Sequence, residues 1–561
     1  MTQRDGQSVE RIAARLRGDA AHAWEVMRRQ GPSQVQFWLI ALLIGTAAGF
    51  AALGFRIGIS ALQTALYGTD DMRLASVART LPWYWVLAVP VLGGLVVGVI
   101  LHRFTPDGRV RAVADVIEGA ALNRGRVEVK AGLASALASL ITLSSGGSSG
   151  REGPVVHLAG VLSTWVADRI NASGLTGRDL LGCAVAGAVS ASFNAPIAGT
   201  LFALEVVLRH FAVHAFAPIA IAAVAGTVIN RLKFGDVTEF TLPPDAGLAF
   251  YVELPAFLIL GLVSGLVAVA LMKAIFWAED VAGAVQARTG LPRWLRPAVA
   301  GLLLGLLAIP FPHIIGVGYE TTSAALTGGI GLAEAIALAA VKTLAVAITL
   351  GGRMGGGVFS PSLVIGALTG LAFGLVATGF LPELSGTETL YALAGMGAVA
   401  AAVLGAPIST AMIVFELTGD WQTGLAVMCA VSLSTALASR MVDRSFFLTQ
   451  LERRDVHLAA GPQAYLLATL MVTGVMRPAG SERAPPEAEA WALVEAGTFV
   501  GAQRTLEAAM PLFESTGAAF LPVVRLGGEG AAPELLGTLH HVDALRAYNR
   551  ALADTAAEEH S

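Results

Sequence analysis

Charged residues are scarce in this chain. Asp, Glu, Lys and Arg make up 14% of its 561 residues and 55% are hydrophobic, whereas soluble domains carry about 25% charged residues. A water-soluble enzyme of this length would need polar surfaces over several domains, so the composition excludes one for most of the chain. The net charge of −4 is too small to indicate a nucleic-acid partner.

Cysteine and lysine are also rare. Cys183 and Cys429 are the only cysteines, and neither has a partner at metal-ligand spacing, which argues against a disulfide framework and against a metal site. Only four of the 37 basic residues are lysine, a bias that favours a bacterial genome rich in G and C. The polar, basic opening leads us to expect no cleavable signal peptide.

Apolar segments recur from residue 37 to about residue 438. Segments such as 83–101 and 258–278 have the roughly 20 residues that span a bilayer as a helix. Other apolar segments are short or interrupted by glycine or proline, which predicts broken helices. Such helices are tolerated at membrane depth only where they are buried in protein or line a cavity. The pattern therefore predicts a polytopic transporter or channel rather than an anchor. Short or interrupted apolar segments lie at 155–166, 197–208, 363–377 and 408–417.

The charge pattern divides the chain into three parts. Arginines cluster in segment 1–34 and again in segment 440–454, which by the positive-inside rule places both ends of the membrane region in the cytoplasm. We expect a cytoplasmic segment 1–34, a transmembrane domain 35–454 and a cytoplasmic domain 464–561. Within the last we expect helices at 505–520 and 542–552, strands at 521–524 and 535–541, and a loop at 481–490.

The membrane region contains an internal repeat. The glycine-rich segment 146–160 resembles 355–370, and 193–207 resembles 404–418. Pro154 and Pro361 differ by 207 positions, and Glu205 and Glu416 by 211. Two paired motifs in the same order at a nearly constant offset indicate a duplication, with repeats at about 37–230 and 250–447. Duplicated halves with broken helices are a recurrent transporter plan, in which the site lies between the halves.

Each repeat carries a glycine-rich loop that opens a helix near a proline, at 150–154 and at 357–361. Helix N-termini attract anions through unpaired amides and the helix dipole. Glu152 is then unexpected, because a carboxylate there either competes with an anion or carries a proton. Ionisable groups inside a membrane are costly and by default functional. The alternative is that Glu152 caps a helix near the headgroups and pairs with Arg151.

Enzyme motifs are missing from the same region. The sequence GGSSGREG lacks the Lys-[Ser/Thr] that ends a phosphate loop, and no Gly-x-Ser-x-Gly or HExxH pattern accompanies the nearby histidines. We therefore interpret His157, His210 and His214 as surface or helix-end residues, and we expect no enzymatic activity.

The motifs at 150–154, 193–196 and 357–361, in this order, resemble those of the CLC chloride channel and transporter family. The resemblance implies a homodimer in which each subunit has its own anion pathway between two inverted halves. It further implies that Glu152 is the gate, alternately occupying and leaving an anion site. The implied anion-binding residues are Gly150, Arg151, Glu152, Gly153, Val358 and Phe359.

The sequence departs from the family pattern in three places. Arg111 falls where the family's anion-contacting serine usually lies, and it points either into the anion path or toward cytoplasmic water. Phe447 takes the place of the family's inner tyrosine. Val206 stands where proton-transferring members often carry an acid. Its neighbour Glu205 is the remaining candidate for the proton path with Glu152, although it points about 100° away around a helix.

The tail from about residue 464 resembles a CBS module, and it has room for one unit where the family normally has two. A CBS pair often binds adenine nucleotides, so a single unit makes such a cofactor doubtful and favours pairing across a dimer. The expected fold is thus mainly α: a polytopic membrane protein of two inverted repeats of broken helices, plus a small α/β CBS-like cytoplasmic domain.

The leading functional hypothesis is transport of chloride or a similar inorganic anion across the bacterial inner membrane, in exchange for protons and gated by Glu152. A passive anion channel is the first alternative, because Val206 cannot titrate. A membrane-anchored nucleotide sensor is a remote second, because an anchor needs no glycine-rich loops at membrane depth.

Overall fold

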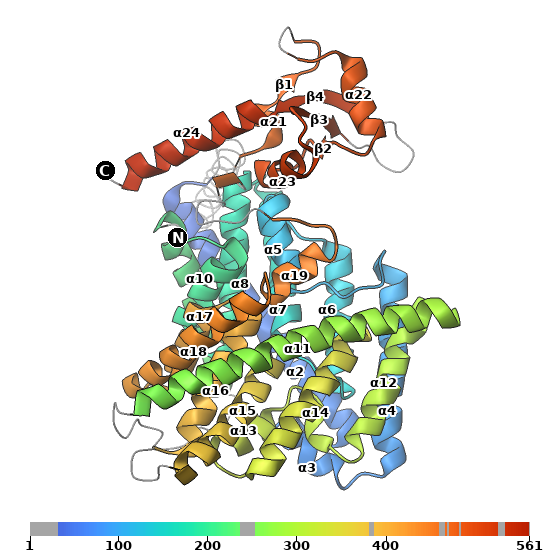
Figure 1. The fold of residues 1–561 in the computed structure, drawn as a ribbon, viewed down its shortest axis with the longest axis vertical. Coiled ribbons are helices and arrows are strands. Elements are labelled where there is room, and N and C mark those ends of the chain that lie inside the picture. The colour runs from blue at the N-terminus through green and yellow to red at the C-terminus, as the bar shows by residue number, and fades with distance from the viewer. Residues whose placement is uncertain are drawn as a thin grey trace, which may run out of the picture.

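A computed structural model describes residues 32–211, 213–235, 253–380, 386–458, 466–467, 470–481, 484–525 and 533–559. Segment 1–31, with its arginines, lies outside the described residues. Figure 1 shows a large helical body with a small α/β domain, drawn in orange and red, at one end. We call this end the proximal side and the opposite end the distal side. Within the described residues, seven helices are long and apolar enough to cross a membrane.

The first half of the helical body runs from α2 to α10. Helix α4 contains the expected span 83–101, and α7 begins at Glu152, two residues before the expected proline start. Helix α9 continues into a π-helical turn, η1, which carries Glu205. The elements are α2 (Gln34–Tyr67), α3 (Leu74–Ala78), α4 (Trp83–Phe104), α5 (Val113–Leu122), α6 (Val129–Ser144), α7 (Glu152–Arg169), α8 (Gly174–Phe193), α9 (Pro196–Phe202), η1 (Ala203–Leu208) and α10 (Val213–Phe234).

The second half runs from α11 to α19. The segment 363–377, expected to be a short helix, is part of the 22-residue α15, whereas α17 is short as expected. The elements are α11 (Leu254–Thr289), η3 (Arg293–Leu295), α12 (Arg296–Ala308), η4 (Pro312–Ile314), α13 (Tyr319–Leu326), α14 (Leu332–Gly351), α15 (Phe359–Phe380), α16 (Glu388–Leu404), α17 (Pro407–Thr418), α18 (Trp421–Met441) and α19 (Phe446–Glu452).

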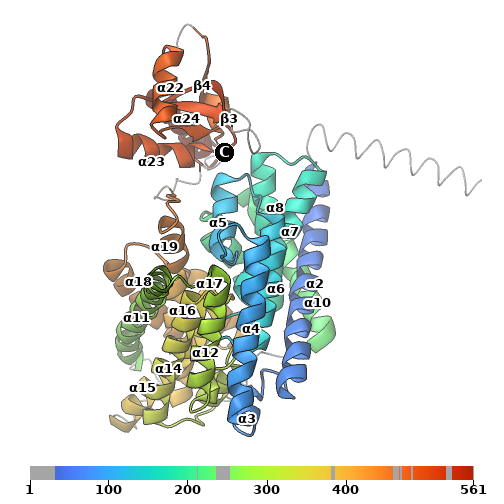
Figure 2. The ribbon, with the colours of Figure 1, turned by 90° about the vertical axis from the view of Figure 1, so that its right-hand side faces the viewer.

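The two halves lie side by side, as Figure 2 shows. Glu205 and Glu416 make matching contacts between them: Glu205 accepts bonds from the amides of Ile408 and Ser409 at the start of α17, and Glu416 from those of Ile197 and Ala198 at the start of α9. Each half therefore caps a helix of the other through the residue that the repeat predicts. The mainly helical fold built of two inverted repeats is confirmed.

Glycines let the helices within each half approach closely. A Cβ on Gly187 of α8 would lie 2.9 Å from the Cα of Gly45 on α2, and one on Gly395 of α16 would lie 2.6 Å from the carbonyl oxygen of Gly366 on α15. Helix packing in membranes relies on such small residues, because lipid supplies no hydrophobic drive between helices.

The C-terminal domain is a four-stranded sheet in the order β1-β4-β3-β2 with helices around it. Strands β3 and β4 pair antiparallel, and β2 pairs parallel with β3. The expected helices and strands are present, but α22 begins inside the segment expected to be a loop, of which residues 482–483 are not described. The elements are α21 (Val472–Val475), β1 (Arg477–Pro478), α22 (Glu487–Glu495), β2 (Val500–Gly501), α23 (Leu506–Thr516), β3 (Phe520–Arg525), β4 (Glu534–His540) and α24 (His541–Glu559).

Candidate functional site: an anion cavity between two helix ends

The two glycine-rich loops meet in the middle of the protein. The amide of Gly150 donates to the carbonyl oxygen of Gly357, and the amide of Gly357 donates to that of Gly150, each over 2.7 Å. This antiparallel bridge ties the start of α7 to the start of α15. The structure thus brings together the two helix N-termini that the sequence predicts as an anion site.

Glu152 reaches across this junction. Its carboxyl oxygen Oε1 accepts a 2.6 Å bond from the hydroxyl of Ser360, the second residue of α15. The side chain is 2% exposed, so it does not lie among lipid headgroups, although the ion pair with Arg151 that this alternative expects is present at 3.9 Å. The carboxylate lies where the dipole of α15 favours an anion, as expected of a gate that competes with the transported ion.

Arg151 lies beside Glu152 and also lines a cavity on the distal side of the protein. Its Nε lies 3.9 Å from Oε1 of Glu152, and its Nη2 donates to the carbonyl oxygen of Ser192 at 3.0 Å. Its guanidinium carbon lies 5.3 Å from the ring centre of Tyr319. Arg151 is therefore a fixed positive charge beside the carboxylate.

A small cavity lies on the proximal side of this junction. Its volume is about 20 Å³, slightly more than the ~10–15 Å³ that one water-sized sphere occupies, so it suits one small ion. Four helix N-termini contribute to its wall, those of α5, α7, α15 and α19. The wall consists of Ala112, Val113, Gly153, Leu350, Gly356, Gly357, Val358, Phe359, Phe446, Phe447 and Gln450.

The structure therefore places Gly153, Val358, Phe359 and Phe447 at one cavity, together with the loop residue Gly150 behind it. Phe447 presents a ring without a hydroxyl. Gln450 is a polar wall residue that the sequence analysis did not identify. It lies about one helical turn after Phe447, the last residue of this segment for which the family resemblance implied a role.

Arg111 does not line this cavity. Its guanidinium bonds to Asp107 at 2.9 Å and to Glu128 at 2.9 Å, and lies 3.7 Å from Asp115. Its neighbour Ala112 takes the wall position at the start of α5 instead. The expectation that Arg111 reaches the anion is therefore not supported, because three carboxylates on the proximal side hold its charge.

Glu205 is also engaged elsewhere. Besides the two amides of α17, its Oε2 accepts a 2.7 Å bond from the hydroxyl of Ser409. Val206, beside it, is 6% exposed. These bonds give Glu205 a capping role and argue against the proton path expected for it.

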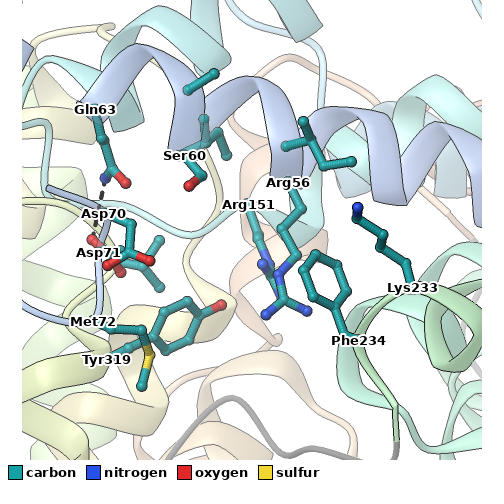
Figure 3. A pocket seen from close by; sticks show the side chains of 14 residues that line it. Arg56, Ser60, Gln63, Asp70, Asp71, Met72, Arg151, Lys233, Phe234 and Tyr319 are labelled. Carbon is teal, nitrogen blue, oxygen red and sulfur yellow. Dashed lines mark hydrogen bonds between the residues drawn. The ribbon is translucent and has the colours of Figure 1, made fainter. Parts of the chain in front are cut away.

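A cavity of about 340 Å³ opens on the distal side. Figure 3 shows Arg56 and Arg151 turned toward one another in it, from α2 and the start of α7, with Lys233 nearby. The guanidinium carbon of Arg56 lies 3.7 Å from the ring centre of Phe234. Converging cations in a cavity concentrate anions, and Arg151 joins this cavity to Glu152.

Besides Asp70, the carboxylate of Asp71 lines this cavity with the cations. It lies in the loop after α2, and its Oδ1 accepts a 3.2 Å bond from Gln63. Burial raises the pKa of Asp71 to about 6, although the charges of Lys342 and Arg151 act against the rise. Arg56, Lys233 and Asp71 escaped the sequence reasoning, because they lie in three separate stretches of the chain without a motif.

Known proteins are similar to this chain in sequence. Residues 93–439 match the voltage gated chloride channel family. A putative chloride channel protein ClcB-like from Ralstonia nicotianae is 34% identical over 396 residues, which is 70% of this chain and 91% of that protein.

Solved structures share the fold. A slow cyanobacterial Cl⁻/H⁺ antiporter superposes with a TM-score of 0.66 at 20% identity, over 75% of this chain and 98% of that one. A eukaryotic CLC transporter superposes with a TM-score of 0.64 at 17% identity, over 93% of this chain and 98% of that one. The family match, the identity and the fold agree: this chain belongs to the CLC family.

Proposed function

We propose that this protein exchanges chloride, or a similar small inorganic anion, for protons across the bacterial inner membrane, with Glu152 as the gate. The bond from Ser360 to the carboxylate of Glu152 carries the proposal. An acid that occupies the place of an anion at a helix end vacates that place when it is protonated. One residue can thereby couple proton binding to anion passage.

The distal cavity supplies the way in for the anion. Arg56, Lys233 and Arg151 would raise the local anion concentration, and the amides around the small proximal cavity would bind the ion without a full positive charge. Binding of this kind is weak enough for the ion to leave, as flux requires. The likeness to a Cl⁻/H⁺ antiporter supports exchange over passive conduction.

The test is a liposome experiment with chloride and pH electrodes recording together. A chloride gradient at zero voltage should drive protons uphill in the wild type. Glu152→Gln should carry chloride without protons and without dependence on pH, because an amide mimics the protonated acid. Chloride flux without proton movement in the wild type would instead establish a channel.

Assembly and orientation belong to the same proposal. We place the C-terminal domain in the cytoplasm and the distal cavity outside the cell. Helices α9, α10, α17 and α18 expose large apolar side chains, which we propose as the homodimer face. In such a dimer, the single CBS-like unit of one subunit would pair with that of the other rather than bind a nucleotide alone. These side chains include Ile197, Phe216, Val224, Ile408 and Trp421.

A further inference from the structure

A charged cavity of about 240 Å³ lies on the proximal side, near α5 and the starts of α6 and α7. Figure 2 shows these three helices together at the end of the body that faces the C-terminal domain. The volume holds several water-sized spheres, at ~10–15 Å³ each. The charged residues in its wall are Asp107, Arg111, Asp115, Glu118, Arg126, Glu128 and Arg454.

His157 lies in the wall of this cavity. It is 1% exposed, and neither ring nitrogen has a hydrogen-bond partner among the described residues. The interpretation of His157 as a surface or helix-end residue is therefore wrong. Buried polar groups in proteins are almost always hydrogen-bonded, so two open nitrogens at a polar cavity indicate a group that exchanges bonds with water.

The backbone of α6 makes room for the ring. A Cβ on Gly132 would lie 2.5 Å from Cε1 of His157 and 2.7 Å from its Nδ1. Glycine at this position lets the imidazole lie between α6 and α7 and still reach the cavity.

Carboxylates lead from the solvent to this ring. The side chains of Asp107 and Glu128 are 41% and 62% exposed, whereas that of Asp115 is 11% exposed. Two guanidiniums balance them: Arg111 bonds to Asp107 and Glu128, and Arg454 donates to Asp115 at 2.8 Å. Acidic side chains thus line the cavity from its exposed rim to the buried histidine.

His157 follows Glu152 by five residues on α7, about 7.5 Å along the helix axis at 1.5 Å per residue and about 140° around it, so a route between the two side chains runs around the helix. We propose that His157 is the inner proton-transfer residue, passing protons between the proximal cavity and Glu152. One ring nitrogen accepts a proton while the other releases one, which leaves a neutral imidazole in its other tautomer, and a flip of the ring restores the first tautomer for the next transfer. The inference rests on the proposed exchange function and names the inner half of its proton route.

The test compares His157→Gln with His214→Gln in liposomes that record both ions. His214 is a histidine whose side chain is 58% exposed, so its replacement is the matched control. We expect His157→Gln to lower proton flux at least tenfold while chloride still flows, and His214→Gln to match the wild type. Equal proton flux in the wild type and His157→Gln would overturn the inference.

Chemical rescue separates transfer from a structural role. In His157→Ala, imidazole added on the proximal side should enter the cavity and restore proton flux in proportion to its concentration. Loss of both fluxes in His157→Gln without rescue of His157→Ala would also overturn the inference. A wild type that moves no protons would sink the exchange function itself, which is a different result.

Discussion

The hydroxyl of Ser360 donates to the carboxylate of Glu152, the proposed gate, so its loss should release that side chain. Hydrogen bonds to charged groups contribute about 1.5–3 kcal/mol, and without this one the carboxylate competes less well with an anion. We expect Ser360→Ala to speed chloride efflux from liposomes several-fold at pH 7.

Ser362→Ala is the matched control for this change. It removes a hydroxyl on the same helix that donates 2.6 Å to the carbonyl oxygen of Phe359 and does not touch Glu152. Similar efflux rates in the Ser360 and Ser362 variants would show that the bond to Glu152 does not restrain the gate.

Asp71 should make anion binding in the distal cavity depend on pH. With a pKa of about 6 it is ionised at pH 7.5 and neutral at pH 5, so acidification leaves the cations less opposed. Chloride affinity should rise by two- to fivefold on acidification, the scale of ~0.5–1 kcal/mol for a partly exposed charge pair. Asp71→Asn should show the higher affinity at both pH values.

Calorimetric titration with chloride measures this affinity at both pH values. In a Glu152→Gln background the titration contains no contribution from the carboxylate of Glu152. Asp70→Asn removes the same charge from the same cavity wall, at a carboxylate to which we do not assign the pH dependence, and should leave that dependence in place. A pH dependence that survives in Asp71→Asn would assign it to another group.

At the scale of elements, the matching caps should stabilise the protein without carrying protons. Removing a helix cap costs about 0.5–2 kcal/mol. Glu205→Ala should therefore lower the thermal midpoint by a few degrees, and Glu416→Ala somewhat less, because Glu205 accepts a third bond from Ser409.

Proton flux decides between the two roles of Glu205. If Glu205 is a helix cap, the Glu205→Gln variant should retain proton flux in liposomes. Loss of proton flux with an unchanged midpoint would restore Glu205 to the proton path.

The elements were largely predictable, because apolar length, glycine and proline act locally. The repeat also predicted which loops would meet, and Glu152 followed from a carboxylate at a helix start. The orientation of Arg111 stayed open and His157 was misplaced, both for a tertiary reason. Their surroundings consist of α5, α6 and residues such as Arg454, which only the folded chain brings together. No local pattern could show that Gly132 leaves room for an imidazole.

At the scale of the whole molecule, described residues of the C-terminal domain contact the membrane body near η1 and near α5. Glu507 of α23, whose side chain is 3% exposed, pairs with Arg209 at the end of η1 at 3.0 Å. Arg504 donates to Asn123 at 2.9 Å, and Thr505 donates to the carbonyl oxygen of Ala121 at 3.1 Å. The domain thus holds the ends of both η1 and α5.

Glu507→Gln should loosen this contact, because breaking a buried ion pair leaves the other charge unpaired. We expect faster amide hydrogen exchange in α5 and α23. Arg525→Ala breaks an exposed pair with Glu534 inside the domain, with side chains 58% and 60% exposed, and such pairs contribute ~0–1 kcal/mol. Equal amide hydrogen exchange in both variants would mean that the ion pair of Glu507 does not hold the C-terminal domain to the membrane body.

The bridge between Gly150 and Gly357 also bears on biosynthesis. The two amides belong to segments about 200 residues apart, and loops that long close late, after local helices have formed. A ribosome that has delivered only the first half has made one side of the binding site and none of its complement. Anion binding therefore marks the end of maturation, and a translation product cut short in the second half would occupy the bilayer without forming a route through it.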